Sequence, residues 1–372
     1  MENKKRILLF IDSNIKTIPY EVPLLELKKK GNNIIFLSIL ESGQIHEEYK
    51  KYDIEVFSMD EKTITLKHIL KYLFFFIQFC KKQKVDVVFA HLSIPSFVSV
   101  LGQYFIKAKV FCFRHHFNFI NLSAEKKYRQ NNADAMLDKV NARLASKIIL
   151  PSNTLIDLIQ SNEGVPRTKM VVIPYAYNWS QFLEGSSSKA ASINCDSPLK
   201  LLMISRLTKL KRPELAILLL ASLHKNGIKS EVTIVGTGDK RQDLTELATS
   251  LGISRFVHFE GFQKDVAPYI INSDFLIHPS LTEASSSVVK EAGVLGLPVI
   301  VCDGVGDFND YINNGNNGWL VDPDNFIIEA KIIIENTDYE KRSSIGKELK
   351  KTILNNFSVT ESVVNSYMAL IF

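Results

Sequence analysis

The chain has 372 residues, which suits two domains of about 100–200 residues each. Hydrophobic residues make up 46% and charged residues 23%, a globular composition that excludes collagen, coiled-coil and low-complexity classes. The 45 basic and 40 acidic side chains leave a formal net charge of +5, a mildly basic balance.

In the first half, short apolar runs alternate with longer helical patterns. The predicted strands are Arg6–Asp12, Asn33–Ser38, Ile54–Ser58, Asp86–Ala90 and Lys109–Phe113. The predicted helices are Tyr20–Lys30, Thr65–Lys82 and Ser96–Lys107. This alternation predicts a parallel sheet covered by helices on both faces.

Neither apolar stretch of this half is expected to be a secretory signal or to span a membrane. Ile7–Ile11 is too brief and wrongly flanked for a secretory signal. Ile69–Cys80 falls short of the roughly 20 residues that cross a bilayer. Its aromatic residues and flanking lysines fit an interfacial segment, although packing against a sheet accounts for most of this composition.

A second series of strands and helices follows a region rich in Ser, Ala and Gly, residues 181–198, which we interpret as an interdomain linker. The predicted strands are Leu199–Ser205, Glu231–Val235, Phe256–Glu260, Phe275–His278 and Pro298–Val301. The predicted helices are Pro213–Lys225, Arg241–Leu251, Asp265–Asn272 and Ser286–Leu295. We therefore expect domains at 1–180 and 199–356, with ligands bound beyond the strand ends, in the cleft between domains.

Charge and cysteines bear on the surroundings of the protein. Residues 1–180 hold 26 basic and 17 acidic side chains, or +9, and the remainder holds 19 and 23, or −4. The basic half suggests an anionic acceptor or membrane surface, and ordinary solvated lysines explain it as well. The four scattered cysteines fit neither a disulfide scaffold nor a zinc site, so a cytoplasmic protein is expected.

Two loops at predicted strand ends carry diphosphate-binding chemistry. Arg206 and Lys211 follow the strand Leu199–Ser205, and a guanidinium with an ammonium is a common pair for gripping a diphosphate. Gly236 and Gly238 follow the next strand and would let backbone approach a ligand closely, although a plain tight turn explains them as well.

The stretch from Pro279 to Gly293 is the most informative. Ser285, Ser286, Ser287 and Val288 begin a predicted helix whose first amides form an anion site. Glu283 precedes that site and Glu291 follows it. Two carboxylates on either side of an anion site predict a nucleotide-linked sugar between them, with Glu291 on the ribose hydroxyls.

These residues resemble the GT-B glycosyltransferases of family 4, the glycogen-synthase-like retaining group. The resemblance covers most of the chain and rests on the matches E-x7-E, R-x4-K, V-G-x-G, E-G-F, G-L-P-V-I and G-N-N-G-W-L-V-D-P. It implies two facing Rossmann-like domains and a C-terminal helix, about 357–372, that crosses back to the first. One departure is the loop Asp12–Pro19, which lacks the family's glycines, and another is Glu283-Ala284-Ser285-Ser286 in place of Glu-Gly-Phe-Gly.

The resemblance also implies roles for individual residues. Arg206 and Lys211 would hold the diphosphate, Glu283 would orient the hexose, and Gly261 and Phe262 would join the donor site. His115 is similar to a histidine that touches the transferred sugar, and since two adjacent histidines cannot both point inward, one of His115 and His116 is structural. From their position at the strand end, Arg114 and His116 are candidates to contact the acceptor, and surface solvation explains Arg114 as well. His258 and His278 read as core histidines.

The sequence therefore predicts a retaining transferase that moves a hexose or N-acetylhexosamine from a UDP or GDP sugar to a glycan or lipid-linked glycan. It would act in bacterial cell-surface polysaccharide synthesis, in the cytoplasm or at the inner face of the membrane, with no cofactor, no metal and no nucleic acid. Asp322-Pro323-Asp324 reads as a turn and not as a metal pair. A GT-B-like binding subunit without turnover is the alternative, and no motif supports an epimerase.

Overall fold

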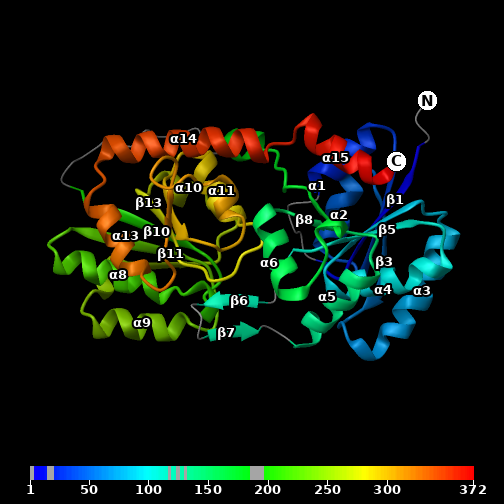
Figure 1. Cartoon of the computed structure of the whole chain (residues 1–372). Coiled ribbons are helices and arrows are strands. Elements are labelled where there is room, and N and C mark those ends of the chain that lie inside the picture. The colour runs from blue at the N-terminus through cyan, green and yellow to red at the C-terminus, as the bar shows by residue number, and fades with distance from the viewer. Residues whose placement is uncertain (1–3, 15–20, 116–118, 123–125, 130–131, 185–196) are drawn as a thin grey trace. The chain divides into compact units, whose positions relative to one another are not determined.

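The chain divides into two α/β units, each built on one parallel sheet (Figure 1). The computed structural model describes residues 4–14, 21–115, 119–122, 126–129, 132–184 and 197–372. The first unit contains Met1–Phe119, Arg129–Tyr177 and Val359–Phe372. The second contains Asn178–Ser358 and the segment Ile120–Tyr128.

The first unit has seven strands in the order β3-β2-β1-β4-β5-β8-β9. Its strands are β1 (Arg6–Ile11), β2 (Asn33–Leu40), β3 (Glu55–Glu61), β4 (Val87–His91), β5 (Lys109–Phe113), β8 (Lys147–Leu150) and β9 (Met170–Val172). Its helices are α1 (Glu21–Lys29), α2 (Gln44–Lys51), α3 (Ile69–Lys82), α4 (Ser93–Gly102), α5 (Asn132–Leu144), α6 (Asn153–Glu163) and α15 (Glu361–Ile371). The short 3₁₀ turns η2 (Leu66–His68) and η3 (Gln103–Phe105) precede α3 and follow α4.

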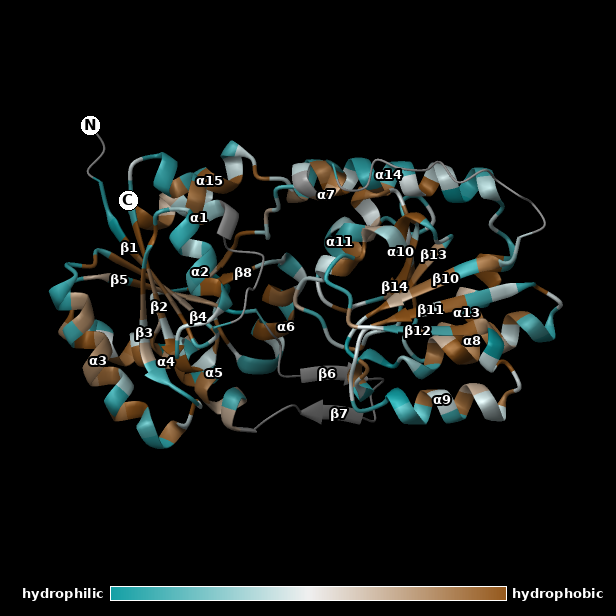
Figure 2. Ribbon diagram, turned by 180° about the vertical axis from the view of Figure 1, so that it is seen from behind, coloured by the Kyte–Doolittle hydropathy of each residue, from teal (hydrophilic) through white to brown (hydrophobic). Residues whose placement is uncertain are grey.

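Helices cover both faces of this sheet, with α1, α2 and α15 on one face and α3, α4 and α5 on the other (Figures 1 and 2). Continuous apolar strands are expected in a sheet covered twice, and Ile7–Ile11 is at most 1% exposed. The core also includes side chains of α15, so the last residues of the chain complete the unit that the first residues begin.

The second unit has six strands in the order β12-β11-β10-β13-β14-β15, and every adjacent pair is parallel. Its strands are β10 (Leu199–Ile204), β11 (Ser230–Val235), β12 (Val257–Gly261), β13 (Phe275–His278), β14 (Val299–Cys302) and β15 (Trp319–Val321). Its helices are α7 (Ser180–Glu184), α8 (Glu214–Lys225), α9 (Arg241–Ser250), α10 (Ala267–Ile271), α11 (Ser287–Val294), α12 (Phe308–Tyr311), α13 (Phe326–Glu335) and α14 (Tyr339–Phe357). In Figure 1, α10, α11 and α14 cover one face and α8, α9 and α13 the other.

The structure differs from the sequence prediction at several elements. The polar helix α2 was not predicted, because only Ile45, His46 and Tyr49 are buried in it. Helix α4 begins and ends earlier than the predicted Ser96–Lys107, since η3 follows Gly102. Helix α7 occupies the start of the predicted linker, where Trp179 packs edge-on against Phe182. Strands β6 (Phe119–Leu122) and β7 (Lys126–Arg129) form a separate two-stranded sheet that groups with the second unit, although chain order placed it in the first.

Within the described ranges, no helix combines the length and the apolar character that crossing a bilayer requires.

Candidate active site

The loops at the carboxyl ends of β10, β11, β13 and β14 meet at one edge of the second sheet. Chain order reverses around β10, since β11 lies on one side of it and β13 on the other. Ligands of open parallel sheets bind at such a reversal. The predicted donor residues follow these strands, so they are brought to one edge.

Lys211 and Glu283 form an ion pair at this edge. The Lys211 Nζ contacts Glu283 Oε1 and also donates to the carbonyl of Thr282 at 3.1 Å. The same Glu283 oxygen lies 2.7 Å from Nε2 of His278, which ends β13. The side chains of Lys211 and Glu283 are only 15% and 13% exposed. His278 is thus both buried and in contact with the site, whereas the sequence placed it only in the core.

Burial by itself would raise the pKa of Glu283. The neighbouring Lys211 ammonium and His278 outweigh burial and lower the pKa to about 2. The carboxylate is therefore ionised at any physiological pH, and it is an acceptor for hydroxyl groups. The ammonium of Lys211 has three donors, of which two are used inside the protein, so one is left for a ligand.

Gly236 and Gly238 act through the protein backbone. A Cβ on Gly236, which has φ +132°, would collide with the carbonyl oxygen of Ser205, and one on Gly238 would collide with that of Leu207. The amide of Leu207 donates to the carbonyl of Thr237 at 2.9 Å. The two glycines therefore let this turn pack tightly against the backbone on both sides of Arg206, and the close approach of a ligand to the same backbone stays a prediction.

The side chain of Arg206 is exposed, and within the described residues it has no hydrogen bond or ion pair. Gly261, at the end of β12, has φ +69° and accepts a hydrogen bond at 2.7 Å from the amide of Gly236. Phe262 follows it and is 75% exposed. An exposed guanidinium and an exposed ring at a sheet edge are open to a ligand.

Two residues that the sequence analysis missed shape the Lys211–Glu283 pair. Arg212 has φ +48° and donates to the carbonyls of Pro279 and Pro323 at 2.7 and 2.6 Å, so it ties the loops after β10, β13 and β15 together. Gly306 has φ +61°, and a Cβ there would lie 2.7 Å from the Cβ of Glu283. No sequence signal separates Arg212 from its basic neighbours, but D-G-V-G-D does predict a tight turn.

The start of α11 is held by Lys290, which was also missed. Its Nζ is fully buried and lies 2.7 Å from both Ser285 Oγ and Asp307 Oδ2, while Ser285 donates to Asp307 at 2.6 Å. Burial lowers the pKa of Lys290, and Asp307 opposes that shift. Ser285 is therefore fixed by a buried network, and Ser286 caps α11 only through its backbone.

Helix α11 presents its first turn at this edge, as predicted from Ser286, Ser287 and Val288. First-turn amides have no partner inside a helix, so they suit an anion. Glu291 lies one turn further on and is partly buried. Burial first, and then Asp265, raise the pKa of Glu291 to about 7.

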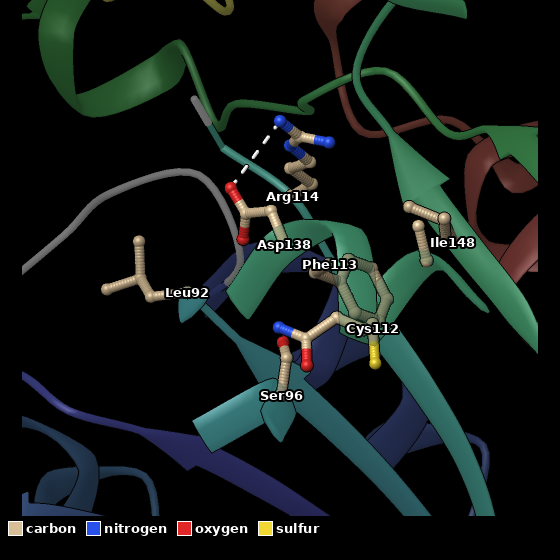
Figure 3. Close-up of a pocket in the computed structure, with 9 residues that line it drawn as sticks. Leu92, Ser96, Cys112, Phe113, Arg114, Asp138 and Ile148 are labelled. Atoms are coloured by element: carbon tan, nitrogen blue, oxygen red, sulfur yellow. Dashed lines mark ion pairs between the residues drawn. The ribbon is translucent and has the colours of Figure 1, made fainter. Parts of the chain in front are cut away.

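Of the three candidates in the first unit, Arg114 and His115 lie within the described residues. Arg114 is 6% exposed, and its guanidinium donates to both carboxylate oxygens of Glu163 at 2.7 and 2.6 Å, with Asp138 at 3.4 Å. Figure 3 shows the Arg114–Asp138 pair beside a cavity of about 20 Å³, room for one water. The expected acceptor contact of Arg114 is corrected, because two buried carboxylates already engage this charge.

His115 follows β5, and both of its ring nitrogens have partners. Nε2 lies 2.7 Å from Nδ1 of His91, and Nδ1 lies 2.5 Å from the hydroxyl of Tyr175. Burial, and then His115, hold the pKa of His91 well below its usual value, so His91 is neutral. The ring of His115 is thus fixed in orientation. His116 and most of the Asp12–Pro19 loop lie outside the described residues.

The described residues contain no group of three or more His, Cys, Asp or Glu arranged to hold a metal ion. Asp322 accepts hydrogen bonds from the amides of Asp324 and Asn325 at 2.7 and 3.0 Å, so Asp322-Pro323-Asp324 is the predicted turn.

Two protein-family models match the chain. "Glycosyl transferases group 1" matches residues 188–352, and "Glycosyltransferase Family 4" matches residues 25–178. Together they cover most of both units.

Named relatives fit these families. The chain is 24% identical over 311 residues, 81% of its length and 79% of the relative's, to the UDP-Gal:alpha-D-GlcNAc-diphosphoundecaprenol alpha-1,3-galactosyltransferase of Escherichia coli. It is 28% identical over 141 residues to LpsE of Rhizobium meliloti, a lipopolysaccharide core biosynthesis glycosyltransferase; this match spans 37% of the chain and only 40% of LpsE. The crystal structure of HepE from Anabaena with UDP-glucose superposes with a TM-score of 0.75 at 20% identity, over 98% of each chain.

Proposed function

Since the chain is a glycosyltransferase of the GT-B fold and of the family 4 group, we propose that it moves a hexose or N-acetylhexosamine from a nucleotide diphosphate sugar. The acceptor in this proposal is a glycan or a lipid-linked glycan of a bacterial cell-surface polysaccharide, made at the inner face of the membrane. UDP is the first candidate for the nucleotide of the donor, because UDP-Gal is in the name of one relative and UDP-glucose is bound in HepE. The observation that carries the proposal is the Lys211–Glu283 pair at the sheet edge where α11 begins.

The donor side of the site supports this chemistry. Arg206 and the remaining donor of Lys211 would bind the diphosphate together with the first turn of α11. The ionised Glu283 would accept hydrogen bonds from hexose hydroxyls, and Glu291 from ribose hydroxyls. Protein cations and amides that are already oriented stabilise the negative charge that develops on a departing diphosphate. Such electrostatic stabilisation is commonly the largest contribution to catalysis.

We propose a retaining, front-face reaction. The bond between the anomeric carbon and the phosphate oxygen breaks, and its electron pair stays on the diphosphate. The acceptor oxygen forms the new bond from the same face, and its proton passes to the departing phosphate. Arg206 and Lys211 supply the positive charge in this proposal, so no metal ion takes part.

The test is acceptor-dependent release of nucleotide diphosphate from a panel of UDP, GDP and ADP sugars. Lys211→Ala and Glu283→Ala are each expected to cut transfer by at least about 100-fold, the effect of losing one electrostatic stabiliser. Lys225→Ala, an exposed lysine at the end of α8, is the matched control and should transfer normally.

Near-normal turnover in either site variant would overturn the site assignment. A chain that is stabilised by a nucleotide sugar but never releases the diphosphate would instead be the binding subunit that the sequence left open.

A further inference from the structure

Helix α3 exposes apolar side chains on the face turned away from its sheet. Tyr72, Phe76, Phe79 and Cys80 are buried. Leu70 and Phe74, one turn apart, are 75% and 65% exposed, and Phe75 is 38% exposed. Packing against the sheet, which the sequence analysis used to explain this composition, therefore accounts for only half of the helix.

The short turns next to α3 extend this apolar surface. Leu66 in η2 is 44% exposed. Gly102 ends α4 against α3, since a Cβ there would lie 2.7 Å from the ring of Phe76 and 3.5 Å from Leu73. Tyr104 and Phe105 in η3 come directly after it and are 69% and 61% exposed. We call Leu66, Leu70, Phe74, Phe75, Tyr104 and Phe105 the α3 surface.

Lysines surround the α3 surface. Residues 62–85 contain six lysines and no acidic residue. Lys71 pairs with Glu61, which lies just outside this stretch. Lys62, Lys67, Lys81 and Lys82 are exposed, so the stretch carries a strong positive charge around an apolar centre.

This combination distinguishes the α3 surface from the exposed apolar face of helix α13. In the second unit, α13 exposes Ile328 and Ile332 at 62% and 52%, but Lys331 on that helix lies 4.0 Å from Glu335 and α13 carries no lysine cluster. Protein interfaces are depleted of lysine, whereas lysines and aromatic rings together are typical of segments that lie in the surface of an anionic membrane.

We propose that the α3 surface binds a bilayer that contains anionic lipid, with the aromatic rings at the depth of the headgroups and the lysines on the lipid phosphates. At 14 residues α3 is too short to span, so it would lie along the membrane. The inference deepens the proposed function, because a lipid-linked acceptor lies in a membrane. Only the biological reason for membrane binding rests on the proposed function. The test of membrane binding requires no turnover.

The test is cosedimentation of the full chain with large vesicles of phosphatidylcholine alone or with added phosphatidylglycerol. The chain should bind the anionic vesicles at low salt, and binding should weaken at about 0.5 M salt. The double variant Leu70→Ser/Phe74→Ser should bind at least about tenfold more weakly, because it removes two exposed apolar side chains that the proposal places in the membrane. Lys81→Glu/Lys82→Glu should lose the preference for anionic lipid.

The matched control is Ile328→Ser/Ile332→Ser, which should bind vesicles like the unmodified chain. Circular dichroism and stabilisation by UDP should be unchanged in every variant, since the altered side chains are exposed. Absence of binding at low salt, equal binding by the Leu70/Phe74 variant, or a dimer that this variant disperses would each overturn the proposal. Vesicle binding without sugar transfer would leave it standing while the proposed function fails.

Discussion

Two carboxylates eight residues apart have opposite environments in the candidate site. Glu283 meets the cation of Lys211 and the ring of His278, which hold its pKa at about 2 against the effect of burial. Glu291 is partly buried, and burial and then the charge of Asp265 raise its pKa to about 7. Carboxyl groups whose pKa values are separated in this way commonly have different tasks. Here Glu283 is always charged, and Glu291 changes charge near neutral pH.

We expect nucleotide affinity to fall as the pH drops through about 7, with a loss of up to about tenfold between pH 8 and pH 6. The reason is that ribose hydroxyls donate to the ionised carboxylate, and the raised pKa of Glu291 leaves it mostly protonated at pH 6. Isothermal titration with UDP over this range measures the effect.

The control is Glu291→Gln, which keeps the titration of the nucleotide phosphate but removes that of residue 291. This variant should bind weakly with a flatter pH profile. If the UDP affinity of Glu291→Gln falls with pH as steeply as that of the unmodified chain, the titrating group is not Glu291. The linked effect on stability has the opposite sign. The pKa of Glu291 in the folded chain exceeds its unfolded value of 4.5, so the contribution of Glu291 to folding stability is fully present below about pH 4.5 and is lost as the pH rises through about 7.

At the scale of elements, the start of α11 and the loop after β14 depend on one buried ion pair. Lys290 is held in α11, and Asp307 precedes α12. The pair fixes Ser285 beside the first turn of α11, and the loop that leads to Asp307 packs Gly306 against Glu283. Both parts of the candidate site are therefore positioned by buried groups.

Lys290→Met is expected to destabilise the second unit by about 3–5 kcal/mol, because it leaves the Asp307 carboxylate buried without its cation. The double variant Lys290→Met/Asp307→Leu should recover most of this loss, since a buried pair exchanged for apolar side chains is often neutral. Urea unfolding measures both values.

Nucleotide affinity should remain reduced in the stable double variant, because Ser285 has lost both of its partners. This separation of stability from binding distinguishes positioning from simple packing. A double variant that is stable and binds UDP normally would exclude the positioning role.

At the scale of the whole molecule, the chain leaves the first unit near residue 177 and returns to it at Val359. Helix α15 begins at its cap Thr360, and its apolar side chains enter the core of the first unit. The ring of Tyr367 stacks on that of Phe113 with centroids 5.9 Å apart and lies edge-on to Phe89 at the same distance. Phe113 ends β5, the strand that Arg114 and His115 follow, so the end of the chain supports that loop.

Tyr367→Ala is expected to destabilise the first unit by about 3–5 kcal/mol, the cost of removing a buried aromatic ring. Ser362→Ala, on the exposed side of α15, should change stability by at most about 0.5 kcal/mol. Unfolding followed with and without UDP separates the units, because UDP should still stabilise the second unit in the Tyr367 variant. Equal loss in both units would show that they unfold as one.

The sequence by itself determined the two parallel sheets and the sheet edge where Arg206, Lys211, Glu283 and the start of α11 lie. Short apolar strands that alternate with helices allow few other folds, and a strand's carboxyl end is read directly from where its apolar run stops. The family was identified from motifs and their spacing, which are also local, and the role of Glu283 that this resemblance implies stays a prediction.

Only the tertiary structure decided which charges face a ligand and which face each other. Arg114 and Arg206 are alike in sequence, since each follows a strand, yet Arg114 meets Glu163 and Asp138 while Arg206 is exposed. Lys290 reads as a helix-surface lysine until Asp307, 17 residues later, is seen beside it. The exposed rings of α3 likewise read as core. Partners distant in the chain determine burial and pairing, and one sequence without its contacts does not specify them.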